Sequence, residues 1–202
     1  MVEITAELRQ ILEDGGVVAY PTSTLPGLGC LPTKKGLDTL FDIKKRPVNQ
    51  PVSLGVASIK QAEKIVNIPQ FAISLLKDFP LGSLTLILDA KETLDSRLGG
   101  ERVAVRVFAD AVAKKLAEVV GPITATSANP SGVVPSSNVA LAAQSLNLEK
   151  ISILDGDCPG GDGSTILSIE KNRVTNAGFS VTIMREGVVP QADVVSWMRK
   201  MR

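Results

Sequence analysis

Histidine is absent from the 202 residues of the chain, and cysteine occurs only twice. Without histidine, Ser-His-Asp and Cys-His catalysis and every histidine-ligated metal site are excluded. The two cysteines, Cys30 and Cys158, form no CxxC pair. This spacing argues against a zinc site or a disulfide scaffold and fits a reducing compartment. We therefore expect each cysteine to be a small buried hydrophobic residue.

The chain also has few aromatic side chains and almost no net charge. Aromatic residues make up 3% of the chain and hydrophobic residues 44%, so a core must be built from Val, Ile, Leu and Ala. Twenty-two Lys and Arg against 21 Asp and Glu give a formal charge of +1, which provides no global basic field for RNA or an anionic membrane. No apolar run approaches the roughly 20 residues that span a bilayer, and the N-terminus lacks the pattern of a signal peptide. These absences predict a cytoplasmic protein with no membrane contact.

Apolar periodicity predicts alternating helices and short strands. Helices are expected at residues 5–13, 33–44, 58–66, from about 69, 110–120 and 136–145, and an amphipathic segment ends the chain. Strands are expected at residues 17–20, 52–57, 84–88, 102–107, 123–126, 151–154, 164–169 and 181–185. Because no repeat, linker or composition break interrupts this pattern, we predict one α/β domain over residues 1–202, with an open, twisted mixed sheet flanked by helices.

Three hydroxyl side chains follow the first predicted strand and precede a glycine-containing turn. Ligands bind at this place in open α/β sheets, where Thr22, Ser23 and Thr24 could hydrogen-bond a polar substrate. Gly27 and Gly29 would let the backbone approach a ligand or take positive φ. The alternative is a hydroxyl-rich turn that satisfies its own backbone, and the residues alone do not decide between the two.

Clustered cations end the second predicted helix at residues 44–47, with the sequence Lys-Lys-Arg-Pro. Cations at a helix C-terminus complement the negative end of the macrodipole, and this structural role explains most such clusters. The functional alternative is a phosphate clamp in which Arg46 forks onto oxygens while Lys44 supplies a point charge. Nothing local distinguishes these interpretations.

A dense polar loop, Ala-Thr-Ser-Ala-Asn-Pro-Ser-Gly at residues 125–132, leaves a later strand. Ser and Asn beside Gly make good nucleotide cradles, although a turn alone would also use them. The loop is not a P-loop, because GxxxxGK[ST] occurs nowhere in the chain, and no GxGxxG occurs either.

The order of these motifs resembles the YrdC/TsaC family of threonylcarbamoyl-AMP synthases. Seven pieces occur in register over residues 17 to about 187: YPTxT…GLG, KxRP, SLT, VAVR, TSANxSG, STI and RxG. The resemblance implies a YrdC-like fold in its single-domain form. It also implies a nucleotidyltransferase that condenses L-threonine, bicarbonate and ATP to threonylcarbamoyl-AMP and pyrophosphate. The product would serve a downstream tRNA threonylcarbamoyl-transferase machinery, and contact with tRNA or double-stranded RNA is implied as well.

The resemblance also implies roles for nine residues. Lys44 and Arg46 would be catalytic and hold the ATP phosphates, and the remaining nucleotide contacts would be Thr85, Ser127, Asn129 and Arg185. Thr24, Arg106 and Ser164 fall where the family holds threonine. No carboxylate cluster indicates a protein-held metal, so Mg²⁺ is expected to arrive with ATP.

The chain departs from the family's pattern mostly on the threonine side of the expected pocket. Ser23 replaces the usual Glu, Pro26 replaces the usual Tyr, and the segment after Arg106 lacks the usual Pro and His. Two alternatives therefore stay open. One is a YciO-like paralogue with a different nucleotide-dependent activity, and the other is an RNA-binding module of the same fold.

Overall fold

One continuous sheet carries the architecture of the computed structural model, which describes residues 3–172 and 178–200. Its eight strands lie in the order β1-β2-β6-β3-β5-β4-β7-β8. Among the strands of the described residues, the β3–β5 and β4–β7 pairs are parallel and the other neighbouring pairs are antiparallel. The mixed, open α/β sheet confirms the predicted fold class. The strands are β1 (Val18–Tyr20), β2 (Gly27–Gly29), β3 (Ser53–Val56), β4 (Leu84–Asp89), β5 (Arg102–Val107), β6 (Ile123–Ser127), β7 (Thr165–Lys171) and β8 (Phe179–Arg185).

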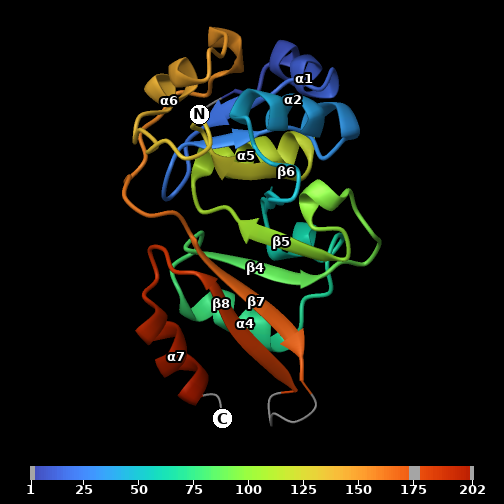
Figure 1. The fold of residues 1–202 in the computed structure, drawn as a ribbon, viewed down its shortest axis with the longest axis vertical. Helices are drawn as coiled ribbons and strands as arrows, with labels where there is room; N and C mark the ends of the chain where they lie inside the picture. The colour runs from blue at the N-terminus through green and yellow to red at the C-terminus, as the bar shows by residue number, and fades with distance from the viewer. Residues whose placement is uncertain (1–2, 173–177, 201–202) are drawn as a thin grey trace.

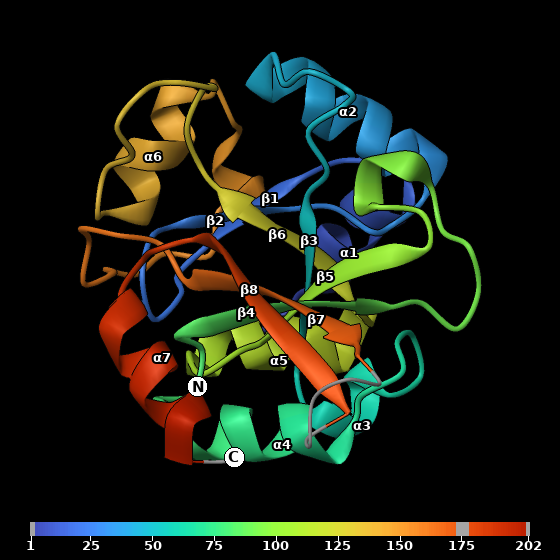
Figure 2. The ribbon, with the colours of Figure 1, turned by 60° about the horizontal axis from the view of Figure 1, so that its bottom comes forward.

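Helices gather around the two ends of this sheet (Figures 1 and 2). The helices α2 and α6 lie near β1, β2 and β6, whereas α4 and α7 lie near β7 and β8. Side-chain caps start three of them, since Thr5, Thr33 and Asp110 each accept a backbone N–H with the side chain. The helices are α1 (Ala6–Glu13), α2 (Lys34–Lys44), α3 (Ile59–Ala62), α4 (Gln70–Asp78), α5 (Ala111–Val120), α6 (Val139–Ser145) and α7 (Gln191–Lys200), with 3₁₀ turns η1 (Ser96–Leu98) and η2 (Lys150–Ser152).

The glycines of the GLG motif form a strand, β2, rather than the turn that the sequence predicted. Neither has positive φ; each instead makes room for the buried Tyr20 ring of the paired strand. A Cβ on Gly27 would lie 2.6 Å from Tyr20 Cζ, and one on Gly29 would lie 2.9 Å from Cε1. The ring also donates from its hydroxyl to the carbonyl of Thr124 on β6. Packing against Tyr20 and, for Gly29, also against Ile123 of β6 therefore explains these glycines, and the motif alone could not reveal it.

Three other expectations about the elements are wrong. Residues 151–154 do not form a strand, because the first two belong to the 3₁₀ turn η2 and Ile153 makes one isolated bridge to Ala19. The helix α3 stops at Ala62 instead of residue 66, because Val66 leaves it to bridge Ala90. The helix α6 begins at Val139, where Asn138 caps it, and not at residue 136. In each case a contact with a distant strand or a stronger cap overrides the local pattern.

Alternation along the central strands separates a core face from an open face. On β4, Leu84, Leu86 and Leu88 are buried in the main core. Thr85 and Ile87, between them, point to the opposite face and line a cavity. The same period of two holds on β5, where three valines pack into the core while Arg102, Ala104 and Arg106 line the cavity. The cavity therefore rests on one face of the middle of the sheet.

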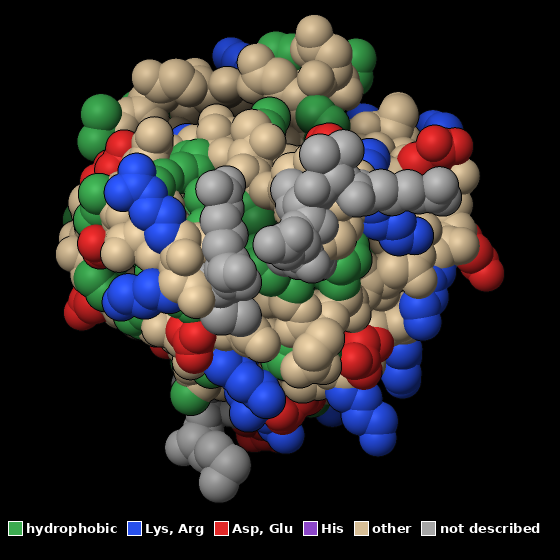
Figure 3. All heavy atoms as spheres, turned by 90° about the horizontal axis from the view of Figure 1, so that it is seen from below, with side chains coloured by type: hydrophobic (Ala, Val, Ile, Leu, Met, Phe, Trp, Pro, Cys, Tyr) green, Lys and Arg blue, Asp and Glu red, His purple; other side chains and the backbone are tan. Residues whose placement is uncertain are grey.

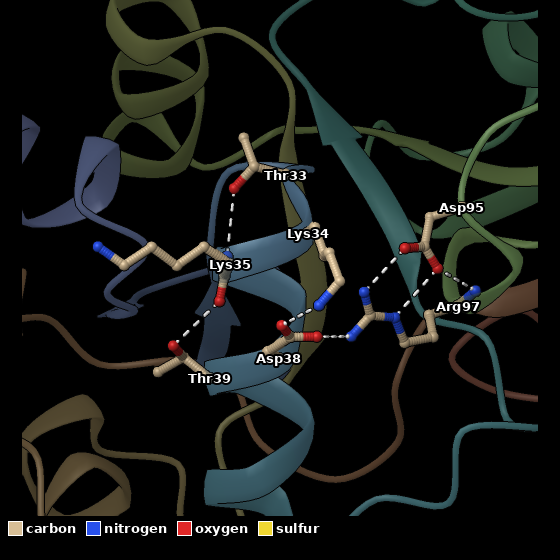
Figure 4. A network of polar contacts seen from close by, with 8 residues as sticks. Thr33, Lys34, Lys35, Asp38, Thr39, Asp95 and Arg97 are labelled. Atoms are coloured by element: carbon tan, nitrogen blue, oxygen red, sulfur yellow. Dashed lines mark hydrogen bonds and ion pairs between the residues drawn. The ribbon is translucent and has the colours of Figure 1, made fainter.

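A polar network fixes α2 beside the sheet (Figure 4). Asp38 accepts from Lys34 one turn earlier and from Arg97 of η1, which also pairs with Asp95. Lys34 and then Arg97 hold the pKa of the Asp38 carboxyl below its ordinary value. The carbonyl of Arg97 accepts from the backbone of Val52, next to β3. Arg97 thus connects α2, which ends at Lys44, with Val52, the residue before β3.

Gly55 on β3 lies directly under the Phe108 ring and tolerates no side chain. A Cβ at this position would lie 1.9 Å from Phe108 Cζ. We expect Gly55→Ala to lower the free energy of unfolding by roughly 3 kcal/mol, because overpacking a filled core forces side chains out of their rotamers. Urea titration of Gly55→Ala, Phe108→Leu and the double variant measures this. The double variant should recover part of the loss, and a simple sum of the two single losses would contradict the steric explanation.

Candidate active site

A cavity of about 440 Å³ opens on the face of the sheet described above. It brings together seven of the nine predicted site residues, each from a separate segment of the chain. Those on the cavity wall are Thr24, Arg46, Thr85, Arg106, Ser127, Ser164 and Arg185. Polar residues from strands, strand ends and the end of α2 therefore converge on one cavity, as is common in α/β sheets.

Three guanidinium groups on this wall have no carboxylate partner among the described residues. Arg46 donates from Nε to the carbonyl of Gln50 at 2.7 Å and from Nη2 to that of Pro51 at 3.0 Å. Arg185 donates to the carbonyl of Ser164 at 2.7 Å. Arg106, which is 8% exposed, donates only to a carbonyl and two hydroxyls. Backbone and hydroxyl oxygens orient the three cations. Burial lowers the pKa of Arg185, and the charge of Asp162 partly offsets this effect without forming an ion pair.

Burial disfavours the charge on these arginines. It lowers the pKa of Arg46, which the charge of Arg185 lowers further, and it also lowers the pKa of Arg106. Because arginine stays protonated in proteins even when its pKa falls, the site carries several partly desolvated positive charges. Such charges attract an anion more strongly than exposed ones do. The cavity is therefore suited to a ligand with several negative groups.

The sequence left two interpretations of the hydroxyls after β1, a turn that satisfies its own backbone and a polar wall for a ligand, and the three residues differ in which they follow. Thr22 serves the turn, since its hydroxyl donates to the carbonyl of Leu25 at 2.7 Å and accepts from the backbone of Thr24 at 3.1 Å. Thr24 and Ser23 instead accept from Nη2 of Arg106, at 2.9 and 3.2 Å. Nε of Arg106 donates to the carbonyl of Gly82 at 2.9 Å. One residue of the motif thus builds the turn, and the other two fix a buried cation on the wall.

Thr85 on β4 lies beside Ser164, the residue before the parallel strand β7, and their hydroxyl oxygens are 2.7 Å apart. The family resemblance implies a nucleotide contact for Thr85 and an amino acid contact for Ser164. Because one hydroxyl donates to the other, the pair acts as a single polar point on the wall.

Lys44 and Asn129, the other two predicted residues, lie outside the cavity wall. Lys44 is 2% exposed, and its Nζ donates to the backbone carbonyls of Ser127 and Asn129. The Asn129 amide donates to the carbonyls of Pro130 and Val133 at 2.9 and 2.6 Å. Its Oδ1 is buried without a hydrogen-bond partner among the described residues. The side-chain atom of Asn129 that remains unpaired among the described residues is therefore a hydrogen-bond acceptor.

Sequence reasoning missed Arg102 and Ser53, which also line the cavity. Arg102 pairs with Asp89 at 2.5 Å and donates to Ser168 of β7 at 2.8 Å, so it joins three strands. Alternation would have revealed it, because Arg102 and Arg106 are four residues apart on one strand face. Ser53 donates to the carbonyl of Ala125, and no motif marks it.

Carboxylates are missing from the cavity wall as far as the structure describes it, and no group of three potential metal ligands occurs in residues 3–172 and 178–200. Cys30 and Cys158 are free and buried, as expected, and burial raises the pKa of Cys30 to about 11. No helix in the described part of the chain is long and apolar enough to cross a membrane.

Comparison with known proteins gives this site a family. Residues 10–187 match the Sua5/YciO/YrdC family, described as "Telomere recombination", and the chain belongs to that family. Among its relatives, the threonylcarbamoyl-AMP synthase of Pyrococcus abyssi is 31% identical over 188 residues, which cover 91% of this chain and 54% of that protein. The synthase of Photobacterium profundum is 29% identical over 184 residues, which cover 87% of this chain and 95% of that protein.

Solved structures agree with this assignment. The structure of Pyrococcus abyssi Sua5 complexed with L-threonine superposes with a TM-score of 0.80 at 29% identity, covering 96% of this chain and 58% of that one. The chain thus spans little more than half of the Pyrococcus protein and nearly the whole length of the Photobacterium one.

Proposed function

We propose that the protein is a threonylcarbamoyl-AMP synthase, which condenses L-threonine, bicarbonate and ATP to threonylcarbamoyl-adenylate and pyrophosphate. One observation carries the proposal. Arg46, Arg106 and Arg185, without carboxylate partners among the described residues, line one cavity together with the hydroxyls of Thr24, Thr85, Ser127 and Ser164. A triphosphate and an amino acid carboxylate supply the negative charge that such a wall requires.

Position along the wall suggests how the ligands divide it. Arg46 and Arg185 would hold the phosphates, as the family resemblance implies, and both line the cavity. Arg106, held by Thr24, would bind the carboxylate of threonine. The Thr85–Ser164 pair would lie where the two ligands meet. This arrangement would bring the amine of threonine close to the α-phosphate.

The reaction can proceed without a histidine. The amine of threonine attacks bicarbonate, water leaves, and a carbamate forms. A carbamate oxygen then attacks the α-phosphorus of ATP, and the bond to pyrophosphate breaks. The wall would contribute mainly by positioning the reactants and stabilising charge on the phosphates, as in other phosphoryl transfers. Mg²⁺ would arrive with ATP, because the wall offers it no carboxylate among the described residues.

Neither alternative is favoured. A main role in RNA binding would call for a basic surface, yet the net charge is +1. On the face in Figure 3, acidic and hydrophobic side chains separate the lysines and arginines. The sequence departures on the threonine side allow a paralogue with another nucleotide-dependent activity, but both relatives compared above carry the synthase name.

The direct test is pyrophosphate release from Mg²⁺ and ATP, with threonine and bicarbonate omitted in turn. We expect release only when both are present. Release without either would replace the proposal with a different nucleotide reaction. Binding of ATP without any release would favour the paralogue. Other amino acids, tested next, would show whether Ser23 and Pro26 alter the preference for threonine.

Asn129→Ala should weaken ATP binding more than threonine binding. The change removes a buried acceptor and also two bonds that shape the loop after β6. We expect about tenfold weaker ATP binding in calorimetry, because one buried hydrogen bond contributes about 1 kcal/mol and a disordered loop adds to the loss. Equal weakening of both ligands would instead mean that the loop shapes the whole cavity.

A further inference from the structure

We propose that Lys44 is a positioning residue for the nucleotide: its ammonium group holds the backbone of residues 127–129 and so fixes Ser127 on the cavity wall, without touching the ligand. This inference rests on the proposed function. It gives the first cation of the KxR motif a different task from the second.

Contacts at three points connect Lys44 with the loop after β6. Its Nζ donates to the carbonyl of Ser127 and, at 2.6 Å, to that of Asn129. Its own backbone carbonyl accepts from the N–H of Ser131 at 3.0 Å. The loop therefore curves around the end of one side chain, which is separated from it by more than 80 residues of sequence.

The loop needs such a partner because it leaves the sheet just after Ser127. The backbone N–H of Ala128 still reaches Pro26 at 2.8 Å, but the carbonyls on either side of it point to Nζ of Lys44. Buried carbonyls without a donor are costly, and an ammonium can donate to several at once. Without the ammonium, the loop would have to turn these carbonyls toward water and move Ser127.

A reversal of the chain separates Lys44 from Arg46. Lys45 caps α2 in the left-handed region, at φ 49°, and its side chain is exposed. As a result, Lys44 points into the protein behind the loop, whereas Arg46 lies on the cavity wall. The two cations of the motif thus serve opposite sides of the same wall.

The charge of Lys44 has no counter-ion among the described residues. Burial, and then the charge of Arg46, lowers the pKa of Lys44 to about 8. Carbonyl dipoles are therefore what stabilises the ammonium. A direct contact with phosphate would depend on its third hydrogen, from a side chain that does not line the cavity.

A double-mutant cycle distinguishes positioning from direct contact. ATP affinity is measured by calorimetry for the wild type, Lys44→Met, Ser127→Ala and the double variant, without threonine or bicarbonate. If Lys44 acts through Ser127, we expect each single change to weaken ATP about tenfold, and the double variant to be within about threefold of the weaker single variant. Losses that multiply would overturn the proposal. The matched control is Lys45→Met, which removes the neighbouring exposed charge and should leave ATP affinity within twofold.

Hydrogen exchange of the free protein tests the same idea without any ligand. In Lys44→Met, the amides of Asn129 and Ser131 should exchange at least about tenfold faster, while those of β4 and β5 keep their rates. Unchanged exchange in the loop would overturn the proposal. If Lys44→Met does not fold, Lys44→Gln, whose shorter side chain keeps an N–H donor, goes through both measurements. Because neither readout requires pyrophosphate release, a failed synthase assay would not be mistaken for a failed positioning role.

Discussion

Replacing Arg46 by Ala is expected to lower pyrophosphate release by about 100-fold or more, the loss seen when one oriented donor is removed from a developing charge. Nε and Nη2 of Arg46 are already held by the carbonyls of Gln50 and Pro51. The guanidinium is therefore oriented before the substrate arrives, and reorientation costs nothing at the moment of reaction. Initial rates at saturating threonine and bicarbonate measure the effect.

Lys45→Ala is the matched control for Arg46→Ala, because it removes a neighbouring cation that is exposed and does not line the cavity. Its rate should remain within twofold of the wild type. Thermal unfolding of both variants shows whether the fold is intact. Wild-type release by a folded Arg46→Ala variant would refute the phosphate-clamp role.

Replacing Arg106 by Met should chiefly damage threonine use. Two or more charge-assisted hydrogen bonds to a carboxylate contribute about 1.5–3 kcal/mol each, so we expect kcat/KM for threonine to fall by about 100-fold or more. ATP affinity, measured without threonine, should change less than threefold. The exposed Arg9→Met is the control for loss of a cation. A larger effect on ATP binding than on threonine use would contradict the assignment of Arg106 to threonine and would place it with Arg46 at the phosphates.

Local signals in the sequence predicted much of the fold. The helices predicted to start near residues 5, 33 and 110 do start there, and Thr5, Thr33 and Asp110 cap them, because a cap involves only the next few residues. Elements that depend on distant partners could not be found this way. The strand β2 needs the Tyr20 ring beside its glycines, and Ile153 is drawn into a single bridge with Ala19. In both cases the decisive contact is absent from the local pattern.

For the site, likewise, the sequence predicted the location but not the contacts of the individual side chains. Polar residues near strand ends predicted the position of the cavity, because the sheet brings those ends together. The direction of each side chain depends on pairings that the sequence does not display. The carbonyls that hold Lys44 belong to a loop in a different part of the chain, and Thr85 meets Ser164 only through the parallel β4–β7 pair. The chemical roles of all nine residues stay predictions until the variants are assayed.

The strand order also bears on how this protein reaches its folded state. Residues on the cavity wall come from positions as far apart as Tyr20 and Arg185, and both parallel pairs join strands that are not consecutive in the chain. Contacts of such long range close large loops and make folding slow. The cavity is also incomplete until β8 has docked, so nascent chains released early would lack a wall. With the proposed function, ATP would bind the fully folded protein and not chains that lack β8. ATP binding would therefore measure how much of the protein has completed folding.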